Sequence, residues 1–425
     1  MVGHMFSNLL LLWSLSRDIF ITGLTYDDPK QQFWNNQNLY SVPRDLDVRL
    51  RGLDLSNNFI RQLHTLVLPH LEQLDLSSNQ LDLISEGAFE NLARLEELNL
   101  SRNALNNNLG SNSKALQSIS RLQSLDISMN GLSDDSAELY LRNKSSLNQL
   151  KMTGNALTRL SPSLFKESKG LRAITIDDNL ISVIEKGTFE PLSHLEMLNL
   201  AKNNLANICD FKLHQVKYLN LSQNSVEFFV THQDDQFYDL EILDLSFNKL
   251  LYFPIVPKMN RLRYLHLQNN LQLDLQSNGL AYISPLFLNA LTQIDALNLQ
   301  DNSVQPCARM DCLSSSESKQ IDVNTSCVTF EQLRTLKHLN LKENDIKMLH
   351  PNTFQETSLV SLNLAENAHM VIHASGNYFN CCDTEWLAIL NESKVYLPDV
   401  GDTECFSVFI IFTRKLCCTQ RSFIV

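Results

Sequence analysis

One recurring pattern, LxxLxLxxNxL, constrains this chain more than any other feature of its sequence. It begins with Leu53-Asp54-Leu55 followed by Asn58, and it returns about every two dozen residues. The intervals between successive pattern asparagines from Asn58 to Asn270 are 21, 24, 27, 25, 24, 24, 21, 24 and 22 residues. Leucine-rich repeats have periods of roughly 20 to 29 residues, so the spacing predicts a leucine-rich repeat solenoid. The series continues at Asn302, Asn344 and Asn367.

The alternation within LxL predicts a short strand whose two leucines point to the same, buried side. One such repeat cannot bury its apolar face, whereas stacked repeats can. We therefore expect an α/β horseshoe with a parallel β-sheet on its concave side. Each pattern asparagine should bond the backbone where the chain leaves the strand, because buried polar groups need partners. Large apolar residues in the second half of several repeats should pack under the convex side: Phe89, Phe165, Phe189 and Phe354.

Because the leucines form the core, a partner would contact the variable positions between them or the lateral loops. The middle position of LxL is rich in acids and amides. This column is either a binding surface or an ordinary feature of such repeats, and the residue types alone leave both open. Its members are Asp54, Asp75, Asn99, Asp126, Lys151, Thr175, Asn199, Asn220, Asp244 and His266.

The chain divides into segments of different character. An apolar core at Leu9–Leu15 predicts a signal peptide region at residues 1–23 and entry into the secretory pathway. No apolar run reaches the roughly 18 residues that span a bilayer, so we expect no transmembrane helix in this chain. We expect the protein at the cell surface or in the extracellular space. The further segments are a degenerate N-terminal cap at 24–46, leucine-rich repeats at 47–376, a C-terminal cap at 377–418 and a tail at 419–425.

The repeat period is irregular at two joints, near residues 270–278 and 367–377. Pattern asparagines there are 8 and 10 residues apart, too few for a solenoid turn. Either whole repeats are absent, through splicing or the gene model, or a local bulge interrupts a shortened solenoid. A third irregularity is the interval of 42 residues from Asn302 to Asn344, which contains a loop insert at 303–328.

Nine cysteines are present, and an oxidising compartment favours their pairing. A Cys307–Cys327 disulfide would hold the inserted loop and leave Cys312 over. A C-terminal cysteine cap is predicted from Cys381, Cys382 and Cys405, with Cys417 or Cys418 as the fourth member.

Four sequons indicate a glycoprotein, whereas motifs of enzymes are missing. The sequence contains no GxSxG, HExxH, P-loop or GxGxxG, and no cysteine or histidine spacing typical of zinc. The net charge of -12 argues against nucleic acid and anionic membrane as partners, since both need a positive face. We expect a non-enzymatic protein with no cofactor, metal or small-molecule substrate. The expected glycosylation sites are Asn143, Asn220, Asn324 and Asn391.

Several segments resemble the vertebrate pair formed by GARP and the negative regulator of reactive oxygen species. They include LNLAKNNLANICDF at 198–211, LEILDLSFNKLLYFPIVP at 240–257 and FNCCDTEWLAIL at 379–390. The likeness covers most of residues 40–406. Compared with the pair, repeats are missing at the two joints, and the tail from Phe406 does not resemble the family's transmembrane helix.

The resemblance implies a protein that binds and presents latent transforming growth factor beta, partly through disulfides from repeat cysteines. Cys209 lies near one such cysteine, so it is the candidate for an intermolecular disulfide; the alternative is a buried or otherwise paired thiol. Gln223 occupies the position of a further GARP cysteine. Two other functions stay open. The repeat style also fits a Toll-like-receptor-type immune ectodomain, and the second family member implies a regulator of the phagocyte NADPH oxidase in the endoplasmic reticulum.

Overall fold

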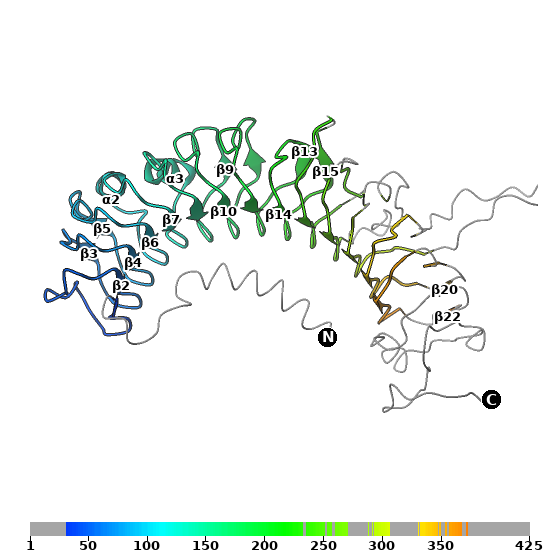
Figure 1. Cartoon of the computed structure of the whole chain (residues 1–425), viewed down its shortest axis with the longest axis horizontal. Helices are drawn as coiled ribbons and strands as arrows, with labels where there is room; N and C mark the ends of the chain where they lie inside the picture. Colours follow the sequence, from blue (N-terminus) through cyan, green and yellow to red (C-terminus); the bar gives the residue numbers. More distant parts are fainter. Residues whose placement is uncertain are drawn as a thin grey trace, which may run out of the picture. The chain divides into compact units, whose positions relative to one another are not determined.

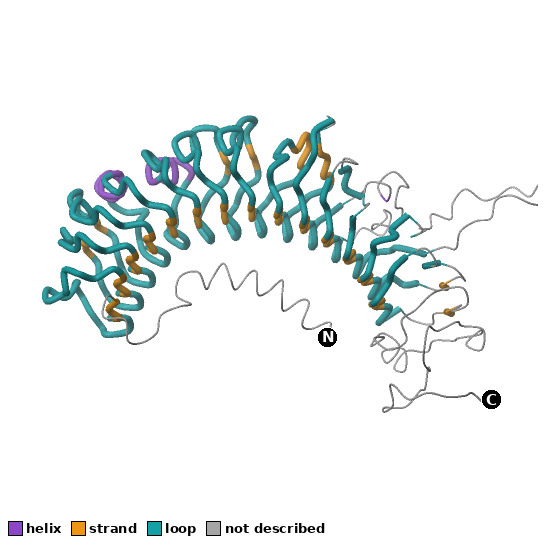
Figure 2. The backbone as a smooth tube through the Cα atoms, in the orientation of Figure 1, coloured by secondary structure: helices purple, strands orange, loops and turns teal. Residues whose placement is uncertain are grey.

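The structure is a computed structural model, and its strands follow the repeat pattern. It describes residues 31–232, 235–250, 253–256, 260–270, 288, 291, 293–306, 330, 332–346, 348–349, 353–354, 357–367 and 371–372. The chain divides into two units, Met1–Leu125 and Asp126–Val425. Strands and turns make up most of both units, and the helices α2 and α3 are short (Figure 2).

In the first unit, the parallel sheet takes one strand from each repeat. The pattern leucines Leu53, Leu74 and Leu98 pair in register along it. A second, two-stranded sheet joins the outer parts of two repeats, and α2 (Leu109–Gln117) follows it (Figure 1). The strands of the parallel sheet are β1 (Gln31–Phe33), β2 (Gly52–Asp54), β4 (Gln73–Asp75) and β6 (Glu97–Asn99); those of the outer sheet are β3 (Gln62–Leu63) and β5 (Leu83–Ile84).

The second unit repeats this arrangement after α3 (Asp134–Tyr140), while β7 (Ser124–Asp126) spans the boundary. Its parallel sheet consists of β8 (Gln149–Lys151), β10 (Ala173–Thr175), β12 (Met197–Asn199), β14 (Tyr218–Asn220), β16 (Ile242–Asp244), β17 (Tyr264–His266), β18 (Ala296–Asn298), β19 (His338–Asn340) and β21 (Ser361–Asn363), in that order. Outer pairs are β9 (Arg159–Leu160) with β11 (Val183–Ile184), β13 (Asn207–Phe211) with β15 (Phe228–Thr231), and β20 (Met348–Leu349) with β22 (Val371–Ile372) (Figure 1).

The core consists of the pattern leucines and the outer phenylalanines, as the sequence predicts. Leu243 and Leu245 have no exposed surface, and the equivalent residues of the other described repeats are also buried. Phe165 stacks on Phe189 with ring centroids 5.7 Å apart. The four expected phenylalanines, Phe89, Phe165, Phe189 and Phe354, are all buried.

The pattern asparagines bond the backbone, which confirms their predicted role. The Nδ2 of Asn203 donates to the carbonyls of Ile176, Leu200 and Ala201 at 3.1, 3.0 and 3.1 Å. Its Oδ1 accepts the amide of Ile181 at 3.0 Å. One side chain thus satisfies buried backbone groups of two successive repeats, where no regular ladder is available to them.

The first joint does not interrupt the parallel sheet. Most of it lies outside the described residues, but the strands on either side of it, β17 and β18, pair directly, with Leu265 opposite Leu297. Likewise β18 and β19 pair across the interval that contains the inserted loop. The described strands on both sides of these long intervals therefore pair in register.

The segment expected as a degenerate N-terminal cap follows the ladder of the repeats over its described part. β1 pairs in parallel with β2. Asn58 donates to the carbonyl of Trp34 at 2.8 Å, and its Oδ1 accepts the amides of Gln37 and Leu39 at 3.0 Å each. The signal peptide region, the C-terminal cap and the tail lie outside the described residues.

Candidate functional site

The acids and amides at the middle position of LxL bond the backbone at the point where each strand ends. In most repeats the side-chain Oδ1 accepts the backbone amide two residues further on, as Asn199 does from Ala201 at 3.1 Å and Asp244 from Ser246 at 2.9 Å. A short polar side chain that bonds its own backbone in this way forms an Asx turn. The column is therefore explained by strand ends, which favours the ordinary-feature interpretation. The same bond is made by Asp54, Asp75, Asn99, Asp126, Asn220, Asn298, Asn340 and Asn363.

Charged residues of alternating sign, which we call the charged column, occupy the position just before each strand of the parallel sheet from β10 to β19. Arg172 and Lys217 both contact Glu196, at 2.8 and 2.9 Å. Lys337 contacts Asp295 at 3.1 Å, and Arg263 contacts the same carboxylate. The hydrogen bond from Lys217 holds the pKa of Glu196 below its usual value. These pairs are mostly exposed, so each contributes little stability. With Glu241 before β16, the column holds four cations and three carboxylates, a net charge of +1.

Beside the charges runs an apolar stripe, which we define as Met197, Tyr218, Ile242 and Tyr264. These residues begin β12, β14, β16 and β17 and lie opposite one another in register. All four are half-buried on the solvent side of the sheet. A row of aromatic and aliphatic side chains on a sheet face is typical of a protein-binding surface. Sequence reasoning missed this stripe, although the residue before each LxL shows it.

His266 lies on β17, two residues after Tyr264 of the stripe, and it differs from the rest of the middle column. Its imidazole is 8 % exposed, and its Nε2 has no hydrogen-bond partner among the described residues. The Oε1 of Gln268, two residues along the strand, is also buried without a partner there. Burial lowers the pKa of His266, and the neighbouring Asp244 opposes this shift only in part. The imidazole is therefore neutral at physiological pH.

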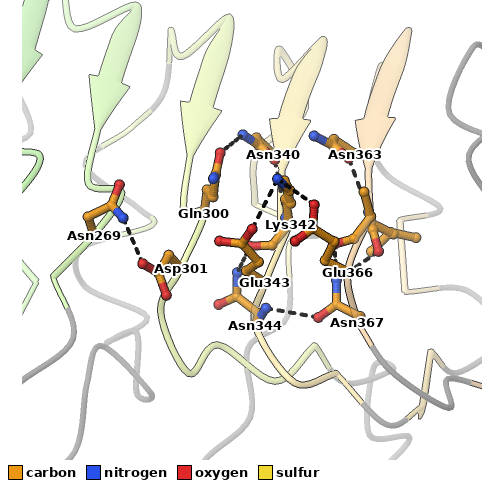
Figure 3. Close-up of polar contacts among 12 residues, drawn as sticks. Asn269, Gln300, Asp301, Asn340, Lys342, Glu343, Asn344, Asn363, Glu366 and Asn367 are labelled. Carbon is orange, nitrogen blue, oxygen red and sulfur yellow. Dashed lines mark hydrogen bonds and ion pairs between the residues drawn. The ribbon is translucent and has the colours of Figure 1, made fainter. Parts of the chain in front are cut away.

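The repeats that follow present a polar network whose groups bond one another (Figure 3). Asn269 donates to Asp301 at 2.6 Å, and Asn340 donates to Gln300 at 3.2 Å. Lys342 lies between Glu343 and Glu366, with Nζ 3.0 and 2.7 Å from their carboxylates. In contrast to these bonded groups, His266 and Gln268 each have one buried atom without a partner among the described residues.

Cys209 lies on the outer sheet, in β13, and its thiol is free and exposed. The pairing of β13 with β15 shifts between Ile208 and Phe211, so Cys209 belongs to a bulge. The next residue, Asp210, has positive φ and forms ion pairs with Lys212 and His232. A bulge re-aims the side chains that it contains, which leaves this thiol accessible. The buried-thiol alternative is wrong.

Two of the four sequons lie among the described residues, and their surroundings differ. Asn143 is exposed in a turn after α3 with φ 58°, and its backbone amide donates to Glu167 at 2.6 Å. Asn220, by contrast, is 3 % exposed on β14 and bonds the amide of Ser222. The folded chain offers Asn143 to solvent and not Asn220. Asn324 and Asn391 lie outside the described residues.

The cysteines predicted to form intramolecular disulfides also lie outside the described residues, so their pairing stays a prediction. They are Cys307, Cys327, Cys381, Cys382 and Cys405, with Cys417 or Cys418 as the fourth member of the cap. Within the described ranges, no group of three or more histidine, cysteine or acidic side chains could hold a metal ion. No helix in the same ranges is long and apolar enough to cross a bilayer.

Substitution Asn143→Gln is expected to remove a glycan from the secreted chain. The exposed turn presents this asparagine, so the variant should migrate faster than the wild type on a denaturing gel. Digestion of both with peptide N-glycosidase should abolish the difference. Asn220→Gln serves as the matched control and should leave mobility unchanged, because that side chain is buried. Equal mobility of Asn143→Gln and the wild type before digestion would show that Asn143 carries no glycan.

Two family models match the chain. The leucine rich repeat matches residues 48–105, 69–132 and 145–205, and the BspA type leucine rich repeat region (6 copies) matches residues 277–395. Together with the parallel-strand solenoid, they define the class: the chain is a leucine-rich repeat protein.

Within this class, the chain is homologous to two transforming growth factor beta activators. It is 30% identical to transforming growth factor beta activator LRRC33 of Danio rerio over 392 residues, which are 78% of this chain and 57% of the relative. It is 32% identical to transforming growth factor beta activator LRRC32 of Mus musculus over 248 residues, 57% of this chain and 37% of the relative. The chain thus spans little more than half the length of the first relative and less of the second.

Among solved structures, the chain is similar to that of a TLR13–ssRNA13 complex. The TM-score is 0.54 at 20% identity, and the match covers 85% of this chain and 52% of that one. At this identity the likeness concerns the fold alone.

Proposed function

We propose that the chain binds transforming growth factor beta in its latent form and presents it at the cell surface or outside the cell, without catalysing a reaction. The homology to LRRC33 over 78% of this chain carries the proposal. The face of the second unit agrees with it, because an apolar stripe beside charges of alternating sign suits a protein partner better than a small molecule or nucleic acid.

We further propose that Cys209 links the partner covalently. Its thiol is free and exposed, as exchange with a disulfide requires. In that exchange the Cys209 thiolate attacks one sulfur of a partner disulfide, a mixed disulfide forms, and the other partner sulfur leaves as a thiolate that takes up a proton. No external oxidant is needed. Noncovalent contacts along the solenoid would hold the partner before and after this step.

Substitution Cys209→Ser, in a chain co-expressed with latent transforming growth factor beta, tests both statements. The wild type should form a complex that resists SDS and dissociates with dithiothreitol. The variant should lose this complex completely and still retain the partner under native conditions. Asn207→Ser, exposed on the same strand, is the matched control and should behave as the wild type.

Two outcomes would contradict the proposal at different levels. If Cys209→Ser still forms the SDS-resistant complex, another cysteine makes the link. If the wild type does not retain the latent growth factor even under native conditions, the proposed function is wrong.

A further inference from the structure

Three side chains line up on the solvent side of β17 and the turn after it. Tyr264, His266 and Gln268 alternate with the buried Leu265 and Leu267, so they share one face of the strand. Asp244 lies directly opposite His266 on the neighbouring strand. The four groups form one patch, which we call the β17 patch.

The β17 patch contains two oxygen acceptors, Gln268 Oε1 and one oxygen of Asp244, that no described residue serves. Gln268 Oε1 only accepts, and no described residue donates to it. Asp244 receives its bonds from Ser246 on Oδ1, which leaves its second oxygen without a donor among the described residues. Nε2 of the neutral His266 is also without a partner there, and it accepts when the ring proton is on Nδ1. Buried polar atoms in native proteins are nearly always bonded, so these atoms need a donor that the described residues do not supply.

We propose that the β17 patch is a socket for an arginine side chain of a protein partner. A guanidinium carries five N–H donors in a planar fork, which can serve several acceptors spread over one face. A lysine ammonium is a compact point charge, and a hydroxyl donates only once. The ring of Tyr264 adds a face on which a planar cation stacks, and Asp244 supplies the opposite charge.

Arg263, which lies beside the β17 patch, bonds Asp295 and not the patch. The guanidinium of Arg263 lies 6.0 Å from the ring centroid of Tyr264, so this ring already attracts a cation. Its Nε donates to Asp295 at 2.8 Å, and its Nη2 bonds the same oxygen. Arg263 therefore stays in the charged column and does not serve the β17 patch. Because Nε2 of His266 is covered, entry of a partner's arginine needs a rotamer change, which is common when interfaces form.

The socket rests on the proposed function only in requiring a protein partner, so one arm of the test uses a small probe. The full secreted chain is labelled with ¹³C-histidine, and the His266 resonance is assigned with His266→Gln. N-acetyl-arginine methylamide should shift that resonance in a saturable manner, and the citrulline analogue, which has no charge, should not. His338 on β19 serves as an internal reference that does not move. Gln268→Leu and Asp244→Asn should each weaken binding of the probe about tenfold.

The second arm measures noncovalent binding of latent transforming growth factor beta to Cys209→Ser chains. Gln268→Leu should raise the Kd about tenfold, whereas Lys342→Gln, in the bonded network beyond the patch, should not change it. A shift by the arginine probe together with no growth-factor binding would support the socket and contradict the proposed function. Absence of any probe-induced shift at His266, with growth-factor binding unaffected by Gln268→Leu, would overturn the socket. Unchanged resonances of the remaining histidines show that each variant is folded.

Discussion

Substitution Asn203→Ala is expected to lower the free energy of unfolding of its repeat by about 4 kcal/mol. The side chain bonds three carbonyls and the amide of Ile181, and alanine leaves these buried groups unmet. Each unmet buried group costs about 1–3 kcal/mol, and we take the low end because the three carbonyls share one amide nitrogen. Hydrogen exchange measures this loss at the site. In Asn203→Ala, the Ile181 amide should lose nearly all its protection from exchange.

The neighbouring Asn204 provides a matched control for this prediction. Its side chain is exposed, and only its backbone amide bonds the chain, to Ile181 at 2.8 Å. Asn204→Ala should change stability by no more than about 0.5 kcal/mol. Equal loss of protection in the two variants would contradict the role assigned to the pattern asparagines, because both changes remove the same chemical group.

Substitution Phe165→Ala is expected to cost about 3–5 kcal/mol, the range for truncating a buried aromatic side chain. Phe165 is fully buried and stacks on Phe189 of the next repeat. Its loss opens a cavity between two repeats, and stability in a solenoid depends on such nearest-neighbour contacts. Urea denaturation followed by circular dichroism should show a lower midpoint.

Phe247→Ala is the matched control, because this phenylalanine is 50 % exposed. We expect a change of less than about 1 kcal/mol. If Phe165→Ala unfolds at the same urea concentration as Phe247→Ala, the outer phenylalanines do not hold neighbouring repeats together.

Much of the fold could be predicted because every repeat must bury the same leucines and bond the same backbone groups. The leucines at Leu243 and Leu245 must be buried whatever precedes or follows them, and the asparagine at Asn248 must serve the same backbone groups. Because these requirements recur in every repeat, they appear as a periodic pattern in the sequence. The class of protein follows from them directly.

The candidate site was less predictable, because its properties depend on neighbouring repeats. The sequence left open whether the middle column is a binding surface or an ordinary feature of such repeats. Its acids and amides bond their own backbone, and the apolar stripe beside it was missed. Asn143 and Asn220 carry the same sequon, yet one lies in an exposed turn and the other on a strand between packed neighbours. The exposure of Cys209 depends on a bulge that exists only when β13 pairs with β15.

The sequence by itself determined the solenoid, the phase of its strands, the inward leucines and the buried asparagines, because these follow from a short period and from the need to bury apolar surface. The tertiary structure alone decided which strands meet across the long intervals, as β17 meets β18. It also decided that Asp244 lies opposite His266, 22 residues away in the chain, and that two polar atoms of the β17 patch are buried without a partner among the described residues. Burial and pairing of this kind are set by contacts between repeats, and a pattern read within one repeat does not contain them.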